Sequence, residues 1–307
     1  MLSKILYYGI LLPLSYLPLG LLYLLFKPVF WVLYYVVGYR KKVVEKNIAQ
    51  SLPEKTLSER KQIIRDFYLF LTQLLAESIK NLSISKKNLT KRLTVKNPEL
   101  MEKLYQEGKS VIFLSAHYNN WEFLITAQNI IFPHQAIGIG TPLSNSFFNT
   151  KINKRRARFG MAIANANDYK AILSAHSKTP TATLMLGDQA PNHVENSYWT
   201  EFLHQKTPFF FGAEIMANQN QSAVVYGTLQ KVKKGYYQLE LKLITASPND
   251  EKYGMITQEY ADLLAQDIQH EPSKWLWSHK RWKRQIPENL TAVQFSHQQR
   301  FEDKFRN

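Results

Sequence analysis

The chain of 307 residues carries 39 Lys and Arg against 24 Asp and Glu, a net charge of +15, and contains no cysteine. This length gives room for one large domain or two ordinary ones, and a hydrophobic share of 45% excludes a largely disordered chain. The lack of cysteine excludes a disulfide framework, a cysteine-ligated metal site and a thiol nucleophile. The basic balance predicts an anionic partner, which is nucleic acid, an anionic membrane or an acidic protein.

The first 40 residues are predicted to form a membrane anchor. From Ile5 to Phe26 the only ionisable side chains are tyrosines, and the run from Pro28 to Gly38 is again apolar. A spanning helix needs about 20 apolar residues, so this stretch is long enough to enter a bilayer. A secretory signal peptide is disfavoured, because the stretch far exceeds the roughly 7–15 residues of such a signal and no cleavage site follows it.

The topology of this anchor stays open between a single spanning helix and a re-entrant one. Three prolines and a glycine interrupt it, at Pro13, Pro18, Gly20 and Pro28. A basic cluster follows at once, formed by Arg40, Lys41, Lys42 and Lys46. By the positive-inside rule this cluster lies on the cytoplasmic side of the inner membrane, so the rest of the chain is expected in the cytoplasm. The alternative is a buried apolar helix pair in a soluble protein.

Residues 41–290 are predicted to form one α/β domain, and residues 291–307 a polar C-terminal tail. No internal repeat or flexible linker divides them. Short apolar runs predict strands at 111–114, 136–139, 161–164, 181–186, 223–229 and 236–244. Helical spacing predicts helices at 53–82, 97–108, 144–158, 168–175, 211–219 and 257–269. This alternation predicts a central mixed, largely parallel sheet flanked by helices, with a hairpin through Lys233, Lys234 and Gly235.

The segment after the strand at 111–114 carries the predicted chemistry. His117 follows the apolar run, and Asn119 is the predicted N-cap of the next helix. Glu122 then falls in the first helical turn, where its carboxylate can hydrogen-bond the His117 imidazole. A carboxylate in that position orients a general base and stabilises the imidazolium after proton transfer. Carboxyl ends of parallel strands are also where ligands bind in such sheets.

The pattern His117-Tyr-Asn-Asn-Trp-Glu122 after an apolar strand resembles the His-x4-Asp/Glu signature of the lysophospholipid acyltransferase superfamily, in particular its bacterial lipid A late acyltransferase branch. A second formal match, His297 to Glu302, has no strand before it and is interpreted as chance. Further segments resemble the branch in order over residues 1 to about 285. They are the apolar N-terminus, Arg156-Ala-Arg158-Phe-Gly160, Gly187-Asp188-Gln189, Phe209–Ala213 and Trp275–Lys283. Gln189-Ala190 departs from the family pattern, which often has a second acid or His there.

The resemblance implies transfer of a fatty acyl chain from acyl carrier protein, or acyl-CoA, to a hydroxyl of a membrane glycolipid such as a lipid A precursor. His117 is then the general base, Glu122 orients it, and no acyl-enzyme forms. Arg156 or Arg158 stabilises the oxyanion or binds a phosphate. The acceptor contacts implied are Asn120, Asp188 and Gln189. No cofactor is expected, and a metal is disfavoured because one His and one Glu make a poor ligand set.

Each of these assignments has a structural alternative. A lone His after a strand is often a hydrogen-bonded structural residue, Arg156 and Arg158 can belong to a solvated helix face, and Asp188 can cap a turn. Trp275, Trp277 and Trp282 suit a protein core, or a membrane or carrier-protein interface, because basic residues are interleaved with them. The chain could also act on an aminolipid, a lysophospholipid or another glycolipid, or be a lipid-binding module without turnover. Nucleic-acid binding is disfavoured, because no such motif is present.

Overall fold

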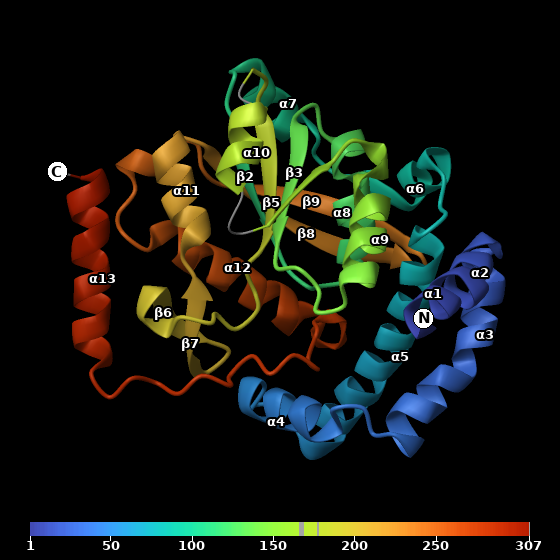
Figure 1. Ribbon diagram of the computed structural model, residues 1–307. Helices are drawn as coiled ribbons and strands as arrows, with labels where there is room; N and C mark the ends of the chain where they lie inside the picture. The colour runs from blue at the N-terminus through green and yellow to red at the C-terminus, as the bar shows by residue number, and fades with distance from the viewer. Residues whose placement is uncertain (166–168, 177, 307) are drawn as a thin grey trace.

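The computed structural model describes residues 1–165, 169–176 and 178–306. Within this part of the chain, seven strands form one sheet in the order β1-β9-β8-β2-β5-β3-β4, and two more form a separate hairpin, β6–β7 (Figure 1). The strands are β1 (Leu93–Val95), β2 (Val111–Ser115), β3 (Gln135–Gly140), β4 (Ala162–Asn165), β5 (Thr181–Leu186), β6 (Ser197–Phe202), β7 (Gln205–Phe210), β8 (Ala223–Lys233) and β9 (Tyr236–Thr245).

The predicted mixed, largely parallel sheet is confirmed. Strands β4, β3, β5, β2 and β8 are parallel to one another, whereas β9 runs antiparallel to β8 and pairs in parallel with β1 at the edge. The predicted hairpin through Gly235 is the β8–β9 connection. The β6–β7 hairpin and the short β1 were not predicted from the sequence.

Helices cover both faces of this sheet. Their bounds are α1 (Leu2–Ile5), α2 (Leu12–Tyr16), α3 (Leu19–Trp31), α4 (Lys41–Ser51), α5 (Leu57–Asn81), α6 (Lys86–Arg92), α7 (Glu99–Gln106), α8 (Trp121–Ile131), α9 (Ser146–Arg156), α10 (Tyr169–Ala175), α11 (Gly212–Asn220), α12 (Met255–His270) and α13 (Leu290–Phe305). Helix α5 begins later than predicted, because Thr56 and Glu59 form a capping box. Of the predicted helix 168–175, Asp168 lies outside the described residues.

Strand β2 is the centre of the molecule. All five of its residues are buried, four of them apolar and the last Ser115, as expected for a strand between two helical layers. Side chains alternate across the sheet, so Ile112 and Leu114 join the core built with α5, α11 and α12. Val111 and Phe113 join the second core, built with α7 and α8. Because β2 packs into a core on each face of the sheet, the position of its carboxyl end is well defined.

The apolar N-terminal segment lies against the body of the molecule (Figure 1). The stretch Leu19–Val36 is long and apolar enough to cross a membrane, and only 17% of it is buried. One face of α3 packs on α5, where Leu19 and Leu22 meet Ala76. The Tyr23 hydroxyl donates to the buried carboxylate of Glu77 on α5. The opposite face, with Leu21, Leu24 and Leu25, is exposed, so α3 is a candidate anchor docked along one side of the domain.

The segment 291–307, which the sequence analysis predicted as a polar tail, is instead largely the helix α13. His297 and Phe301 on this helix are buried against Phe211. The Arg306 guanidinium donates to the carbonyl oxygens of Pro248 and Glu251. In the described part of this segment only His297 and Phe301 are buried, so its sequence shows little hydrophobic pattern.

Candidate active site

The proximity of His117 and Asp188 follows from the sheet. Strands β2 and β5 are adjacent and parallel, with Ser115 opposite Leu186. His117 and Asp188 each come two residues after this pair, so both lie at the carboxyl edge of the sheet. The Nδ1 atom of His117 is 2.7 Å from Oδ1 of Asp188. The backbone N–H of His117 donates to Oδ2 of the same carboxylate at 3.0 Å.

Asp188 is a buried carboxylate, and both of its oxygens accept hydrogen bonds. Besides His117, the indole Nε1–H of Trp275 donates to Oδ2 at 2.9 Å. Burial would raise the pKa of Asp188, but the His117 ring and the donors from His117 and Trp275 outweigh burial and hold that pKa below its ordinary value. The carboxylate therefore stays ionised and fixes the imidazole with Nδ1 as its N–H donor.

The second nitrogen of the His117 ring faces the side-chain amide of Gln189. Nε2 lies 3.2 Å from Nε2 of Gln189, whose amide N–H is in reach of the ring lone pair. The Trp121 ring packs edge-on against the imidazole, with ring centroids 5.1 Å apart. The His117 side chain keeps 17% of its surface exposed. A ring fixed on one nitrogen and accessible on the other can take a proton from a bound hydroxyl.

The expectation that Glu122 orients His117 requires correction. The Glu122 carboxylate is instead bound by the Arg156 guanidinium, through Nη2 at 2.5 Å and Nε at 3.2 Å. Burial would lower the pKa of Arg156, but Glu122 outweighs burial and raises it. The carboxylate that holds His117 is Asp188, 71 residues further along the chain. Spacing within one motif could not reveal it, because the contact depends on the pairing of β2 with β5.

Two asparagines of the motif have structural contacts. The N-cap of α8 is Asn120 rather than the predicted Asn119, and its Oδ1 accepts from the Phe123 N–H at 2.9 Å. Asn120 is fully buried and donates its amide to Glu77, which corrects its assignment as an acceptor contact. Asn119 sits in the left-handed region, with φ at +52°, and donates to the Leu229 carbonyl.

Arg158 is also committed to the fold. Its guanidinium donates to the carbonyl oxygens of Arg155 and Ile84, at 2.8 and 3.0 Å. Gly160 ends this 3-10 turn with φ at +104°, and a Cβ there would lie 2.4 Å from the Asn129 amide. Glycine is therefore required at the end of the Arg-x-Arg-Phe-Gly element. Of the two arginines, Arg156 lies beside the motif through Glu122.

The tryptophan-rich element, Trp275–Lys283, contacts the Asp188 loop. Trp275 and Trp277 are buried and belong to the core, whereas Trp282 is partly buried and donates to Thr207. His279 Nε2 accepts from the Ala190 N–H at 3.1 Å. Burial lowers the pKa of His279 to about 4, so this ring is a neutral acceptor that fixes the loop after Asp188.

Arg281 lies beneath the same loop and is fully buried. It donates to the Pro208 carbonyl at 2.7 Å and stacks 4.5 Å from the Phe209 ring centroid. Burial lowers its pKa to about 10, which keeps it charged at neutral pH, and Asp188 opposes that shift. The motif reasoning did not predict contacts of His279, Arg281 or Trp275 with the Asp188 loop. Within the described residues, no group of three or more His, Asp or Glu side chains is arranged to hold a metal ion.

The fold and these contacts define a class: an α/β protein in which a buried aspartate holds a partly exposed histidine at the carboxyl edge of parallel strands. The chain belongs to the bacterial lipid A biosynthesis acyltransferase family, whose model matches residues 1–284. The resemblance inferred from the motifs is thereby confirmed. No individual curated protein matches the chain.

Proposed function

We propose that this protein is a membrane-anchored O-acyltransferase that moves a fatty acyl chain from the thioester of acyl carrier protein, or of acyl-CoA, to a hydroxyl of a lipid A precursor. The observation that carries the proposal is the His117–Asp188 pair in a chain of the acyltransferase family. The proposed location is the inner membrane, with the α/β domain on the cytoplasmic side, where both thioester donors are made.

The proposed reaction needs one base and no acyl-enzyme. His117 Nε2 accepts the proton of the acceptor hydroxyl while the oxygen attacks the thioester carbonyl carbon. Asp188 stabilises the imidazolium that results. Collapse of the tetrahedral intermediate expels the thiolate, which takes the proton back from His117, so proton and leaving group balance. Gln189, beside Nε2, is the proposed polar contact to the acceptor hydroxyl or the developing oxyanion.

Glu122 and Arg156 are proposed to act as a pair beside this base. The bidentate ion pair joins the first turn of α8 to the last turn of α9, and about a fifth to a quarter of each side chain is exposed. A phosphate or carbonyl oxygen of the substrate can approach the remaining guanidinium N–H groups of Arg156.

The test is reconstitution with purified full-length protein in detergent. Acyl carrier protein loaded with a fatty acid, or the matching acyl-CoA, is mixed with a lipid A precursor that has a free hydroxyl, and products are read by mass spectrometry. The proposal expects one added acyl chain, and at least about 10³-fold loss of rate in His117→Ala. A wild type that transfers no acyl chain from either donor, or a His117→Ala variant at near wild-type rate, contradicts it. Transfer only to a lysophospholipid or aminolipid keeps the chemistry and changes the acceptor.

A further inference from the structure

A groove of about 630 Å³ runs between α3 and α5 and is closed by the β8–β9 turn and residues 271–274. We name it the α3–α5 groove. His117, Asp188 and Gln189 are not among the described residues that line it. We propose that the α3–α5 groove binds the headgroup of an anionic phospholipid of the surrounding bilayer. This site is separate from the proposed transfer reaction and does not depend on it.

The charge of the groove favours an anion. Its lining contains five cations and two acids, Asp66 and Glu271. The cations are Lys27, Arg65, Lys231, Lys234 and Lys274. Glu271 pairs with Lys274 at 3.2 Å, which leaves four cations against one acid in the lining. The excess of positive charge in a confined site is the property of basic pockets that bind phospholipid headgroups beside membrane helices.

The inner cation of the groove has a neutral partner. Lys231 is partly buried, and its ammonium donates to the amide oxygen of Gln73 at 2.9 Å. Burial lowers the pKa of Lys231, and Lys274 lowers it further. Glu77 and Glu271 oppose this shift but do not outweigh it, so a phosphate beside Lys231 adds opposite charge and strong hydrogen-bond acceptors.

The apolar wall of the groove distinguishes a lipid from a soluble anion. Phe26, Phe30, Trp31, Leu69 and Phe70 line it alongside the cations. Trp31 and Leu69 are exposed, and they continue into the exposed face of α3 that carries Leu24. A phospholipid matches both parts, since its phosphate suits the lysines and its acyl chains suit the aromatic wall and the bilayer beyond it. Free phosphate would leave this wall in contact with water.

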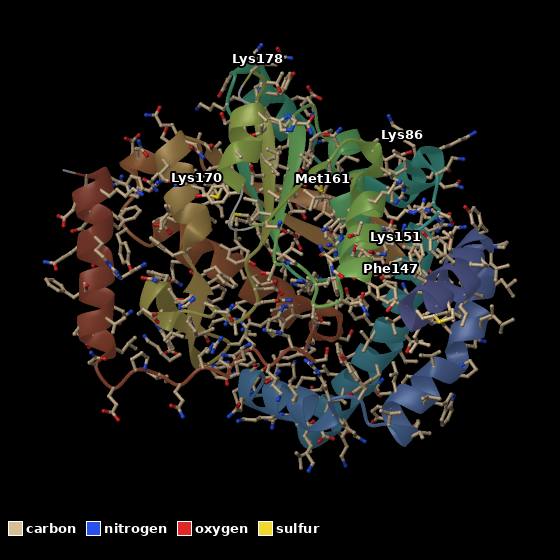
Figure 2. All side chains as sticks on the ribbon, viewed as in Figure 1. Lys86, Phe147, Lys151, Met161, Lys170 and Lys178 are labelled. Carbon is tan, nitrogen blue, oxygen red and sulfur yellow. The ribbon has the colours of Figure 1, made fainter. Side chains whose placement is uncertain are left out.

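The test uses full-length protein in detergent and measures bound lipid by native mass spectrometry while phosphatidylglycerol or phosphatidylcholine is added. We expect one phosphatidylglycerol held per chain, and phosphatidylcholine held at least about tenfold more weakly. Lys231→Gln/Lys234→Gln is expected to weaken phosphatidylglycerol binding by about tenfold or more. The matched control is Lys86→Gln/Lys87→Gln, which removes the same charge from exposed lysines of α6 that do not line the groove. Lys86 is labelled in Figure 2. This control is expected to bind like the wild type.

Four results would overturn the proposal. A wild type that retains no phosphatidylglycerol shows that there is no lipid site. Equal weakening in both double variants shows diffuse electrostatic attraction in place of a site. Displacement of the lipid by millimolar inorganic phosphate shows a site for soluble anions. A groove variant that binds phosphatidylglycerol normally but has a raised KM for a phosphorylated glycolipid acceptor shows that the groove serves the substrate. Since lipid binding is measured without turnover, loss of the proposed acyl transfer alone leaves this proposal standing.

Discussion

His117 is oriented by a residue that lies far away in the sequence and close in the fold. Asp188 accepts from both the ring and the backbone of His117, and it also accepts from Trp275. The start of the loop after β2 is therefore held by one carboxylate. Replacement of this carboxylate changes the hydrogen bonding of the ring itself, whereas a change at Glu122 acts first on Arg156.

Asp188→Asn is expected to lower kcat by about 10²–10⁴-fold with little change in KM. The asparagine can still accept from Trp275, but its amide can present an N–H to His117 Nδ1 and favour the wrong tautomer. The measurement is steady-state kinetics of acyl transfer, together with a thermal unfolding midpoint to show that the variant folds. A rate within about threefold of wild type would contradict the assigned partner.

The ion pair of Glu122 and Arg156 is expected to appear in a double-mutant cycle. We expect a coupling free energy of about 1 kcal/mol between Glu122→Gln and Arg156→Gln in urea unfolding, because the pair is bidentate and partly buried. Glu122→Gln combined with His117→Gln is expected to show coupling near zero. Strong coupling of Glu122 to His117 would restore the orientation predicted from the motif.

The stability of the fold is expected to depend on pH through His297. Burial lowers its pKa to about 4, so between the unfolded value near 6.5 and about 4 the unfolded chain binds a proton that the folded chain does not. Stability is therefore lost as the pH falls through this window. His297→Gln can still accept from Tyr253 and does not titrate. We expect the thermal unfolding midpoint of His297→Gln to rise relative to that of the wild type as the pH falls from 7 to 4.5.

The wild type has to be compared with the His297→Gln variant, because Glu214 changes the stability in the opposite direction over the same pH range. Burial raises the pKa of Glu214 to about 7, so this carboxyl holds a proton in the folded chain that the unfolded chain has lost between about 4.5 and 7. Glu214 is unchanged in His297→Gln and cancels in the difference. A constant difference between the two midpoints over this pH range would refute the role given to His297.

At the scale of elements, the strands of the parallel sheet were predictable because their residues form short apolar runs between polar ones. The predicted segment 181–186 coincides with β5. The β6–β7 hairpin escaped prediction because Pro208 and several polar residues interrupt its pattern. His117 was predictable from its place after an apolar strand. Its partner was not, because the contact depends on which strands pair, and local spacing contains no information on that pairing.

Gly235 couples two elements that are distant in the sequence. Its φ is +74°, and a Cβ there would lie 2.5 Å from the Tyr23 hydroxyl oxygen and 3.0 Å from Leu19 Cδ2, both on or at the start of α3. Gly235→Ala is expected to destabilise the chain by about 1–3 kcal/mol and to push α3 away from the β8–β9 turn. Hydrogen exchange over residues 19–31 measures this displacement.

Gly108→Ala is the matched control. Gly108 also has a positive φ, +70°, but nothing lies within 4 Å of a Cβ built there. It shares the backbone strain and lacks the collision, so it is expected to destabilise the chain without faster exchange in α3. Equal exchange in α3 for both variants would show that the turn does not hold this helix.

At the scale of the whole molecule, exposed apolar side chains gather at the N-terminus. Figure 2 shows Phe147 and Lys151 on α9 beside this segment, and Phe147 packs against Tyr7 with ring centroids 5.8 Å apart. The segment therefore contacts the domain through α9 as well as through α5. Its outward face from Leu2 to Val37 carries most of the large exposed hydrophobic residues in the described chain.

Leu24→Lys/Leu25→Lys is expected to weaken membrane association strongly, by about tenfold or more for each residue, because a leucine that enters the bilayer gains about 1.5–3 kcal/mol. Vesicle flotation of the full-length protein measures it. The control is Ile286→Lys/Phe295→Lys, since these side chains are similarly exposed, at 53% and 62% against 56% and 47% for Leu24 and Leu25. Equal losses in both would mean that the N-terminal face is not the membrane contact.

The helix α13 lies beyond the family match, which ends at residue 284. Yet Arg306 reaches back to Asn218 at 2.9 Å, and the Phe301 and Phe211 ring centroids are 5.5 Å apart. A chain that ended at residue 284 would lack α13 and would expose Phe211, the N-cap of α11, to solvent. The stretch matched by the family model is therefore shorter than the stretch of this chain whose side chains pack on one another.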